Sequence, residues 1–334
     1  METEYASAVR VPESTLQRYR RFSLYNSPYP AHDRGCAIDL YPATNDGVSP
    51  VAGEVLETRT VRAPSKPYAH DEEYLILVDV DRERSGLGSA AATKSESGRD
   101  HLVARILHVQ PRVSAGDRVA VGDSLGQMVR SGFFAPWVAN HVHLGFRRSE
   151  QHLHRAGGSL PVVPDVEAVP VPWDGVGTVV ETGTTYARLD APDHPAPDDR
   201  FAGIAGQRTP DSGGDNSDEA TPATDERTVL DGGFTHYAGG GVLTPGTGTN
   251  ETADSDTTET LSFLDHPVGD VSGRNVAWRD VDVLANGDRI TGLSLFVGVG
   301  PEFGAKLVCP DREFREGQQV RVTIRDSDDP IRLG

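Results

Sequence analysis

Short runs rich in β-branched residues recur along the whole chain, separated by Gly, Pro, Asn and Asp, and they constrain its fold more than any other feature. Such runs are typical of β-strands bounded by turns. The expected strands cover residues 48–55, 74–80, 103–109, 119–121, 141–146, 176–180, 276–284, 293–299, 305–308 and 320–324. One short stretch, residues 13–22, has a helical pattern, which is too little helix for a doubly wound α/β fold. We therefore expect an all-β protein.

The charge distribution divides the chain into two halves. The 334 residues include 32 basic and 50 acidic side chains, a net charge of -18. Residues 1–160 hold 19 acids and 19 bases, whereas residues 161–334 hold 31 acids and 13 bases. A chain of this length is typical of two domains. We expect a first domain over residues 1–160 and a second, acidic domain, a β-sandwich or barrel-like fold, over residues 161–334.

Two segments of the second half are too poor in apolar residues to pack into a core. Residues 207–228 and 244–260 consist mainly of Gly, Pro, Ser, Thr and Asp. Such compositions do not bury enough apolar surface to offset the entropy of ordering the chain. We expect flexible, solvated loops at both places.

The composition also limits the partners and the surroundings of the protein. An excess of acidic charge argues against a nucleic-acid binder, which needs a basic surface. No apolar run approaches the roughly 18 residues of a membrane helix, and the acidic start METEYA lacks the apolar core of a secretion signal. We expect a cytoplasmic protein with no membrane partner. Its acid excess and its three lysines resemble the composition of proteins from salt-loving microbes, in which salt screens the repulsion between acids.

The residues that point to chemistry lie in the first half, at His141 and His143. One residue separates them within an expected strand, so both imidazoles emerge on the same face. This arrangement suits a metal ligand beside a catalytic base. Two histidines in this pattern are also common as ordinary partly exposed residues, so the segments around them carry the interpretation.

Four segments occur here in a characteristic order. They are RGCAIDL at residues 34–40, VSPVAGEV at 48–55, RILH at 105–108 followed by VSAGDRVAVGDSLG at 113–126, and HVH at 141–143. Together they resemble the lysostaphin/LytM-type zinc metallopeptidases over residues 30–147. The segment 113–126 alone also occurs in lipoyl-type domains, but it lacks the lysine that such a domain modifies. The resemblance implies a lysostaphin-like β-sheet domain that hydrolyses peptide bonds with Zn²⁺.

The resemblance also assigns roles to individual residues. It implies that Asp39 and His143 are zinc ligands and that His108 and His141 are the catalytic pair. Three protein ligands leave one position on the metal open for water, as catalytic zinc sites require. The chain has no HExxH motif, so the two catalytic histidines would orient the water and stabilise the oxyanion.

The remaining ligand is the irregular part of the pattern. In the family a histidine stands four residues before the aspartate, where this chain has Gly35. We assign the role to His32, seven residues before Asp39. The thiol of Cys36 is the alternative, because a thiolate is also a good zinc ligand.

The sequence thus predicts a zinc-dependent metallo-endopeptidase whose partner is a peptide or protein substrate. The alternative is a non-catalytic binding module that keeps the peptidase fold with a degenerate metal site. Residues 161–334 contain no motif that points to chemistry, and they are compatible with a substrate-holding, oligomerising or purely structural domain.

Overall fold

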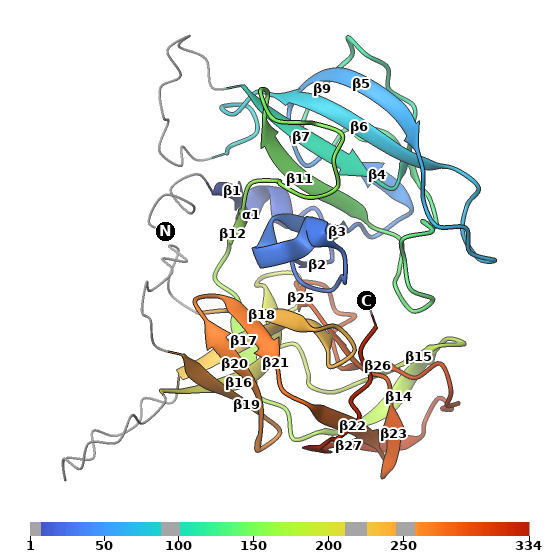
Figure 1. Ribbon diagram of the computed structural model, residues 1–334, viewed down its shortest axis with the longest axis vertical. Coiled ribbons are helices and arrows are strands. Elements are labelled where there is room, and N and C mark those ends of the chain that lie inside the picture. The colour runs from blue at the N-terminus through green and yellow to red at the C-terminus, as the bar shows by residue number, and fades with distance from the viewer. Residues whose placement is uncertain (1–7, 88–100, 211–225, 245–257, 334) are drawn as a thin grey trace, which may run out of the picture. The chain divides into compact units, whose positions relative to one another are not determined.

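The computed structural model describes residues 8–87, 101–210, 226–244 and 258–333 (Figure 1). It is 48% strand and 4% helix, which confirms the expected all-β class with two domains. One compact unit comprises Met1–Leu24 and Tyr29–Val166, and the other comprises Tyr25–Pro28 and Glu167–Gly334. Within the described residues, no helix has the length and apolar character needed to cross a membrane.

The first unit is built on an antiparallel sheet in which every neighbouring pair of strands is antiparallel. Its strand order is β2–β3–β11–β7–β6–β5–β9. The bounds are β2 Arg21–Ser23, β3 Ala37–Tyr41, β5 Gly53–Val61, β6 Glu73–Val80, β7 Leu102–Leu107, β9 Arg118–Val119 and β11 Val142–Arg148. Figure 1 shows β5, β6, β7 and β11 as a run of blue to green arrows.

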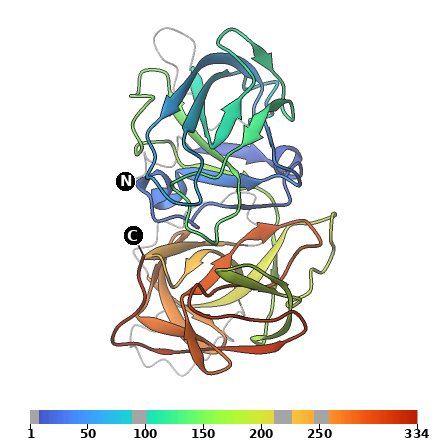
Figure 2. The ribbon, with the colours of Figure 1, turned by 90° about the vertical axis from the view of Figure 1, so that its right-hand side faces the viewer.

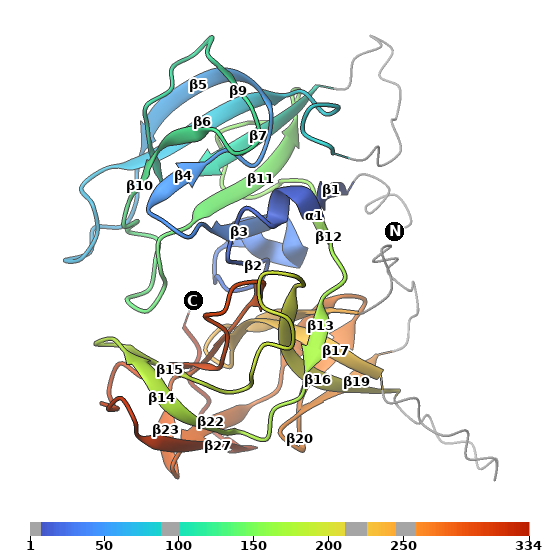
Figure 3. The same ribbon diagram turned by 180° about the vertical axis from the view of Figure 1, so that it is seen from behind.

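Smaller sheets complete this unit. Strands β4 (Asp46–Val48), β10 (Ser124–Met128) and β8 (Val109–Pro111) form a three-stranded antiparallel sheet, whose β4 and β10 are labelled in Figure 3. Strand β1 (Val9–Pro12) pairs in parallel with β12 (Val162–Asp165). The expected strand 48–55 is therefore two strands, because the chain turns between Val48 and Gly53, where the hydroxyl of Ser49 donates to the carbonyl of Val51.

The helix predicted for residues 13–22 was wrong beyond its first turn. Helix α1 covers only Glu13–Leu16, and β2 follows at Arg21–Ser23. Phe22 is fully buried and lies opposite Leu40 of β3. Pairing with a buried neighbouring strand outweighs the local helix propensity of this segment.

The central strands of the first unit are buried on both faces. All five residues of β3 are buried, as are the first five residues of β7 and the first six of β11. Apolar side chains fill most of these positions, among them Ile38, Leu40, Ile106, Leu144 and Phe146. A polar side chain within such a strand needs a partner inside the core, because an unpaired buried polar group is destabilising. Asp39 on β3 and His143 on β11 are two such side chains.

The second unit is also made of antiparallel strands, with one parallel pair between β13 and β16. Its strands are β13 Val169–Val171, β14 Val176–Thr182, β15 Tyr186–Leu189, β16 Ala202–Pro210, β17 Glu226–Phe234, β18 Gly239–Leu243, β19 Glu259–Phe263, β20 His266–Ser272, β21 Asn275–Trp278, β22 Val281–Ala285, β23 Asp288–Ile290, β24 Gly292–Leu295, β25 Val297–Gly298, β26 Lys306–Val308 and β27 Gln319–Asp326. They are coloured from yellow-green to red in Figure 2. Their inner faces enclose one hydrophobic core that includes Leu230, Phe234, Val268, Leu293 and Leu307.

The N-terminal part of the chain contributes four residues to the second unit. Tyr25–Pro28 belongs to it, and the hydroxyl of Tyr25 donates to the side-chain oxygen of Asn275 at 2.9 Å. The unit is therefore not a simple C-terminal segment. A sequence boundary at residue 160 does not account for this contribution.

The two predicted loops of this half were too long at their ends. Strands β16 and β17 include residues 207–210 and 226–228, and β19 includes residues 259 and 260. Residues 207–210 of β16 pair with β19, and residues 207 and 208 also pair with β17, so low apolar content did not prevent strand pairing. Most of the two predicted loops, residues 211–225 and 245–257, lies outside the described residues.

Candidate metal centre

Asp39 and His143 face each other across neighbouring strands. The register of β3 and β11 places the two residues directly opposite each other. Side chains of opposed residues in an antiparallel pair project from the same face of the sheet. Accordingly, Nδ1 of His143 lies 2.9 Å from Oδ1 of Asp39.

His32 approaches the pair from a short 3₁₀ segment, Pro30–Gly35. The segment ends in a turn, because Arg34 and Gly35, its last two residues, both adopt left-handed backbone angles, with φ of 56° and 67°. This turn absorbs the extra residues between His32 and Asp39. The carbonyl oxygen of Leu24 lies 2.8 Å from Nδ1 of His32, so Nδ1 carries the proton and the lone pair of Nε2 is directed at Asp39 and His143.

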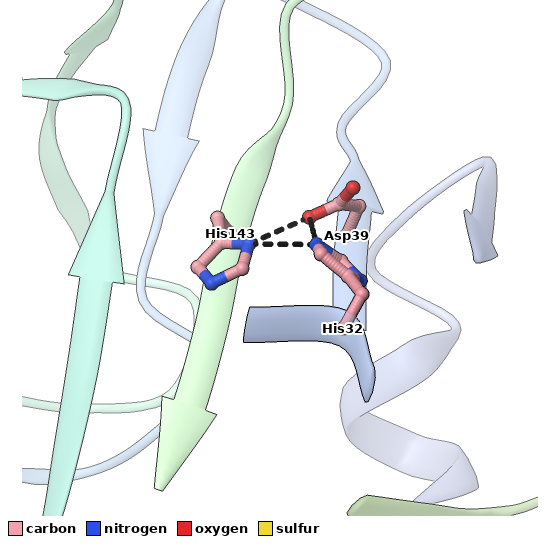
Figure 4. A group of neighbouring side chains, drawn as sticks. All are labelled: His32, Asp39 and His143. Atoms are coloured by element: carbon pink, nitrogen blue, oxygen red, sulfur yellow. Dashed lines mark hydrogen bonds and ion pairs between the residues drawn. The ribbon is translucent and has the colours of Figure 1, made fainter. Parts of the chain in front are cut away.

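The three side chains point at one another, as Figure 4 shows. Nε2 of His32 lies 3.1 Å from Nδ1 of His143 and 3.3 Å from Oδ1 of Asp39. Ligand atoms held about 2.0–2.1 Å from one tetrahedral metal ion lie about 3.3 Å from one another. The spacing of the three atoms therefore matches that of ligands around one ion.

The chemistry of this donor set suits a divalent transition metal. Two imidazole nitrogens and one carboxylate oxygen are ligands that Zn²⁺ accepts, and they leave a fourth position open. The same donors also bind other divalent metals of the first transition row. Among the described residues, the group whose ligand atoms all lie within 4.8 Å of one another contains His32 and does not include Cys36.

His141 lies beside this group, on the same face as His143. Its Nε2 is 3.3 Å from Oδ1 of Asp39. Its Nδ1 is 3.0 Å from the carbonyl oxygen of Ala139, which accepts the Nδ1 proton and leaves the Nε2 lone pair on the side of the site. The alternation expected for residues 141 and 143 thus brings both imidazoles to Asp39.

His108 completes the cluster from the end of β7. It follows the last residue of that strand and has a left-handed backbone angle, φ 72°. Its ring centroid is 5.2 Å from that of His141 and 5.7 Å from that of His143. The structure therefore brings together all five residues to which the sequence assigned a role.

Burial and mutual contacts determine the charges of these groups. Each of the five side chains is between 3% and 6% exposed. Burial raises the pKa of Asp39, but the neighbouring His141 and His32 and the hydrogen bond from His143 outweigh it and hold this pKa well below its usual range. Burial lowers the pKa of His143 to about 3, against the opposing effect of Asp39, and it also lowers the pKa of His141. A carboxylate beside neutral imidazoles is the charge state that metal binding requires.

Two polar residues near the site were not predicted from the sequence. Oε2 of Glu73 accepts a hydrogen bond from Nδ1 of His108 at 2.9 Å, and the hydroxyl of Ser131 donates to the same oxygen. Glu73 begins the apolar strand β6, and an acid at that place is a weak signal, because strand ends often carry charged residues. The pairing of β6 with β7 is what brings Glu73 near His108.

An aromatic side chain packs against the two outer histidines. The ring of Phe134 stacks on His141 at a centroid distance of 4.3 Å and meets the ring of His108 edge-on at 4.7 Å. The guanidinium of Arg130 holds the loop that carries Phe134, donating to the carbonyls of Ala135 and Pro136 at 2.9 Å each. This loop contributes to the burial of the site.

Comparison with known families gives the class of the chain. Residues 10–164 match the N-terminal domain, and residues 169–325 the C-terminal domain, of a family described as domain of unknown function (DUF8155). The two matches together span most of the chain, which belongs to this family. No curated protein and no solved structure matches it. All five side chains of the candidate metal centre lie within the N-terminal match.

Proposed function

We propose that the chain is a zinc-dependent metallo-endopeptidase. The observation that supports this most directly is the convergence of Nε2 of His32, Oδ1 of Asp39 and Nδ1 of His143 at 2.9–3.3 Å, with two further imidazoles beside them. The resemblance of residues 30–147 to lysostaphin/LytM-type peptidases supports the same reaction, hydrolysis of a peptide bond.

The roles of the residues follow from which atoms are available. His32, Asp39 and His143 would hold the ion. Zinc bound to such a set lowers the pKa of a water molecule and polarises a carbonyl group. In His108 and His141 the Nδ1 atoms are engaged with Glu73 and with the carbonyl of Ala139, so their Nε2 atoms remain for the reaction. One would accept a proton from the attacking water, and the other would stabilise the oxyanion.

Access to the site is a requirement of this proposal. Because Phe134 covers the rings of His108 and His141, the loop around it has to move before a peptide reaches them. The burial of all five side chains is also the observation that favours the second candidate function, a non-catalytic module in which the metal only binds, since closed sites are typical of structural metals.

The test begins with the metal. We expect about one zinc ion per chain by elemental analysis, and a loss of affinity of roughly tenfold or more in His143→Ala. A glycine-rich peptide library is a suitable first substrate, chosen on the family resemblance. His108→Ala and His141→Ala should keep the zinc and lower turnover by roughly two to four orders of magnitude.

The outcomes separate the two candidates. Absence of bound zinc after the metal is supplied at neutral pH would exclude the peptidase. Zinc bound through His143, with no cleavage of any peptide by the unsubstituted chain, would favour the binding module. Equal cleavage by the unsubstituted chain and by both histidine variants would show that other residues carry the reaction.

A further inference from the structure

Glu73 makes two separate contacts with one residue, His108. Its Oε1 accepts the backbone N–H of His108 at 3.1 Å, and its Oε2 accepts the Nδ1 proton of the same residue at 2.9 Å. One carboxylate thus holds both the backbone and the ring. The backbone contact coincides with the left-handed φ of 72° at His108, a conformation that a residue with a Cβ adopts only when its surroundings impose it.

The carboxylate is itself held in one orientation. The backbone N–H of Tyr74 donates to Oε1 at 2.8 Å, and the hydroxyl of Ser131 donates to Oε2. Glu73 is 1% exposed, so it is removed from water as completely as the apolar side chains of its strand. A buried carboxylate is destabilising unless hydrogen bonds or an opposite charge compensate it. Here the compensating groups are the backbone amides, the serine hydroxyl and His108.

The contact with Nδ1 determines which nitrogen of His108 remains available. A neutral imidazole carries one proton, and an acceptor at Nδ1 keeps the proton there and leaves the lone pair on Nε2. In water the proton of a neutral imidazole is not restricted in this way. The ring is also held against rotation, because Oε2 fixes one edge and Phe134 packs against it.

We propose that Glu73 is a positioning residue for His108: it holds the Nδ1–H tautomer and directs Nε2 toward the candidate metal centre, and Ser131 keeps the Glu73 carboxylate in place. The effect on catalysis rests on the proposed peptidase function, whereas the effect on the tautomer does not. Glu73 therefore acts on the site through its hydrogen bonds with His108 and is not one of the three proposed metal ligands.

The test reads the tautomer directly. In the full-length chain labelled with ¹⁵N-histidine, the shifts of the two ring nitrogens report which one is protonated, and His108→Gln identifies the signals of His108. We expect the Nδ1–H form at neutral pH in the unsubstituted chain. Glu73→Leu should shift His108 toward the Nε2–H form. Glu73→Gln keeps an acceptor oxygen and should retain more of the Nδ1–H form. Glu72→Gln, at the exposed neighbouring position, is the matched control and should change nothing at His108.

Activity is the second readout. With zinc occupancy unchanged, Glu73→Leu should lower kcat by roughly 10–100-fold and leave KM nearly unaltered. A predominant Nε2–H form of His108 in the unsubstituted chain overturns the proposal without any variant. Unchanged His108 signals in both folded Glu73 variants also overturn it. A tautomer shift in a chain that cleaves no peptide refutes the peptidase function and leaves the positioning by Glu73 intact.

Discussion

The Nδ1–H of His32 donates to the carbonyl of Leu24, and this contact decides what the other nitrogen can do. With Nε2 unprotonated, His32 is able to serve as the third ligand. We therefore predict that His32→Ala lowers zinc occupancy about as much as Asp39→Ala does. Elemental analysis and competition with a chromogenic chelator measure the zinc occupancy of the two variants.

Cys36→Ser is the control for this prediction, because the thiol was the alternative ligand. It should leave zinc binding unchanged. If Cys36→Ser lowers the zinc occupancy while His32→Ala leaves it unchanged, the ligand assignment is wrong. If neither substitution has an effect, the metal is held by fewer protein ligands than the geometry suggests.

The buried carboxylate of Glu73 predicts a specific acid sensitivity. Burial raises its pKa, but the neighbouring His108 and the hydrogen bonds from His108, Ser131 and Tyr74 outweigh this and lower it from 4.5 to about 2. The folded state therefore favours the ionised form. This stabilisation is complete above pH 4.5 and is lost as the pH falls toward 2. It amounts to about 3 kcal/mol in the free energy of unfolding.

Glu73→Gln removes the titrating group, so the free energy of unfolding should fall less steeply below pH 4.5 in this variant. Urea denaturation at several pH values between 6 and 3 measures the slope. Glu72→Gln, the exposed neighbour, should keep the slope of the unsubstituted chain. Identical slopes in all three proteins would mean that Glu73 is not held in its ionised form.

The predictability of these residues depends on how local their arrangement is. His141 and His143 were expected on one face because strand alternation is a local property of the backbone. His32 was assigned as the third ligand, but Cys36 stayed an alternative, since the position of His32 depends on the turn at Arg34 and Gly35, whose conformation no residue pattern specified. Glu73 could not be predicted either, because its contact with His108 arises from strand pairing across 35 positions of sequence.

Among the elements, the turn at the end of the 3₁₀ segment, at Arg34 and Gly35, sets the position of His32. Gly35 has φ 67°, a region in which an added Cβ is destabilising by roughly 1–2 kcal/mol. We predict that Gly35→Ala lowers zinc affinity as well as stability, because relief of the strain moves His32 away from Asp39. Isothermal titration with zinc and thermal unfolding measure the two effects.

Gly116→Ala is the matched control for this turn. Gly116 also has a positive φ, 94°, and an added Cβ there would meet no atom within 4 Å. It should lower stability through backbone strain alone and leave zinc affinity unchanged. Equal zinc affinities in the two variants would show that the turn does not position His32.

The strands, like the single residues, were predictable where a local sequence pattern determines them and not where pairing with distant strands does. Alternating runs identified the positions of β6 and β7 well, because their apolar residues mark buried strands of ordinary length. The pattern at residues 13–22 failed, since Phe22 is buried by pairing with β3 and not by a helix. Polar strands such as β16 were assigned to a loop in part, because composition does not show which strands lie next to them.

For the whole molecule, the uneven charge predicts unequal responses to salt. Residues 161–334 carry 31 acids and 13 bases, whereas residues 1–160 are balanced. At about 1 M salt the screening length falls to about 3 Å, which removes most repulsion between surface acids. We predict that backbone hydrogen exchange in the second unit slows by roughly tenfold or more between 0.1 M and 2 M KCl.

Peptides from the first unit provide the internal control of this experiment. Mass spectrometry resolves the exchange of each unit within the same intact chain, so both experience identical conditions. Exchange in the first unit should change much less. An equal response of the two units would mean that the acidic surface of the second unit does not limit its stability.

The opposition of Asp39 and His143 has a consequence for how the chain unfolds. The two residues are 104 positions apart in sequence. An ion held between them would act as a reversible cross-link that closes a loop of this length. A shift of one residue in the pairing of β3 with β11 would break this cross-link, because the side chain of His143 would then project from the opposite face of the sheet. The unfolded chain does not hold the three ligands together, so under the proposed function a bound metal and the sheet would stabilise each other. Each tenfold rise in free zinc above its dissociation constant would then add about 1.4 kcal/mol to the free energy of unfolding.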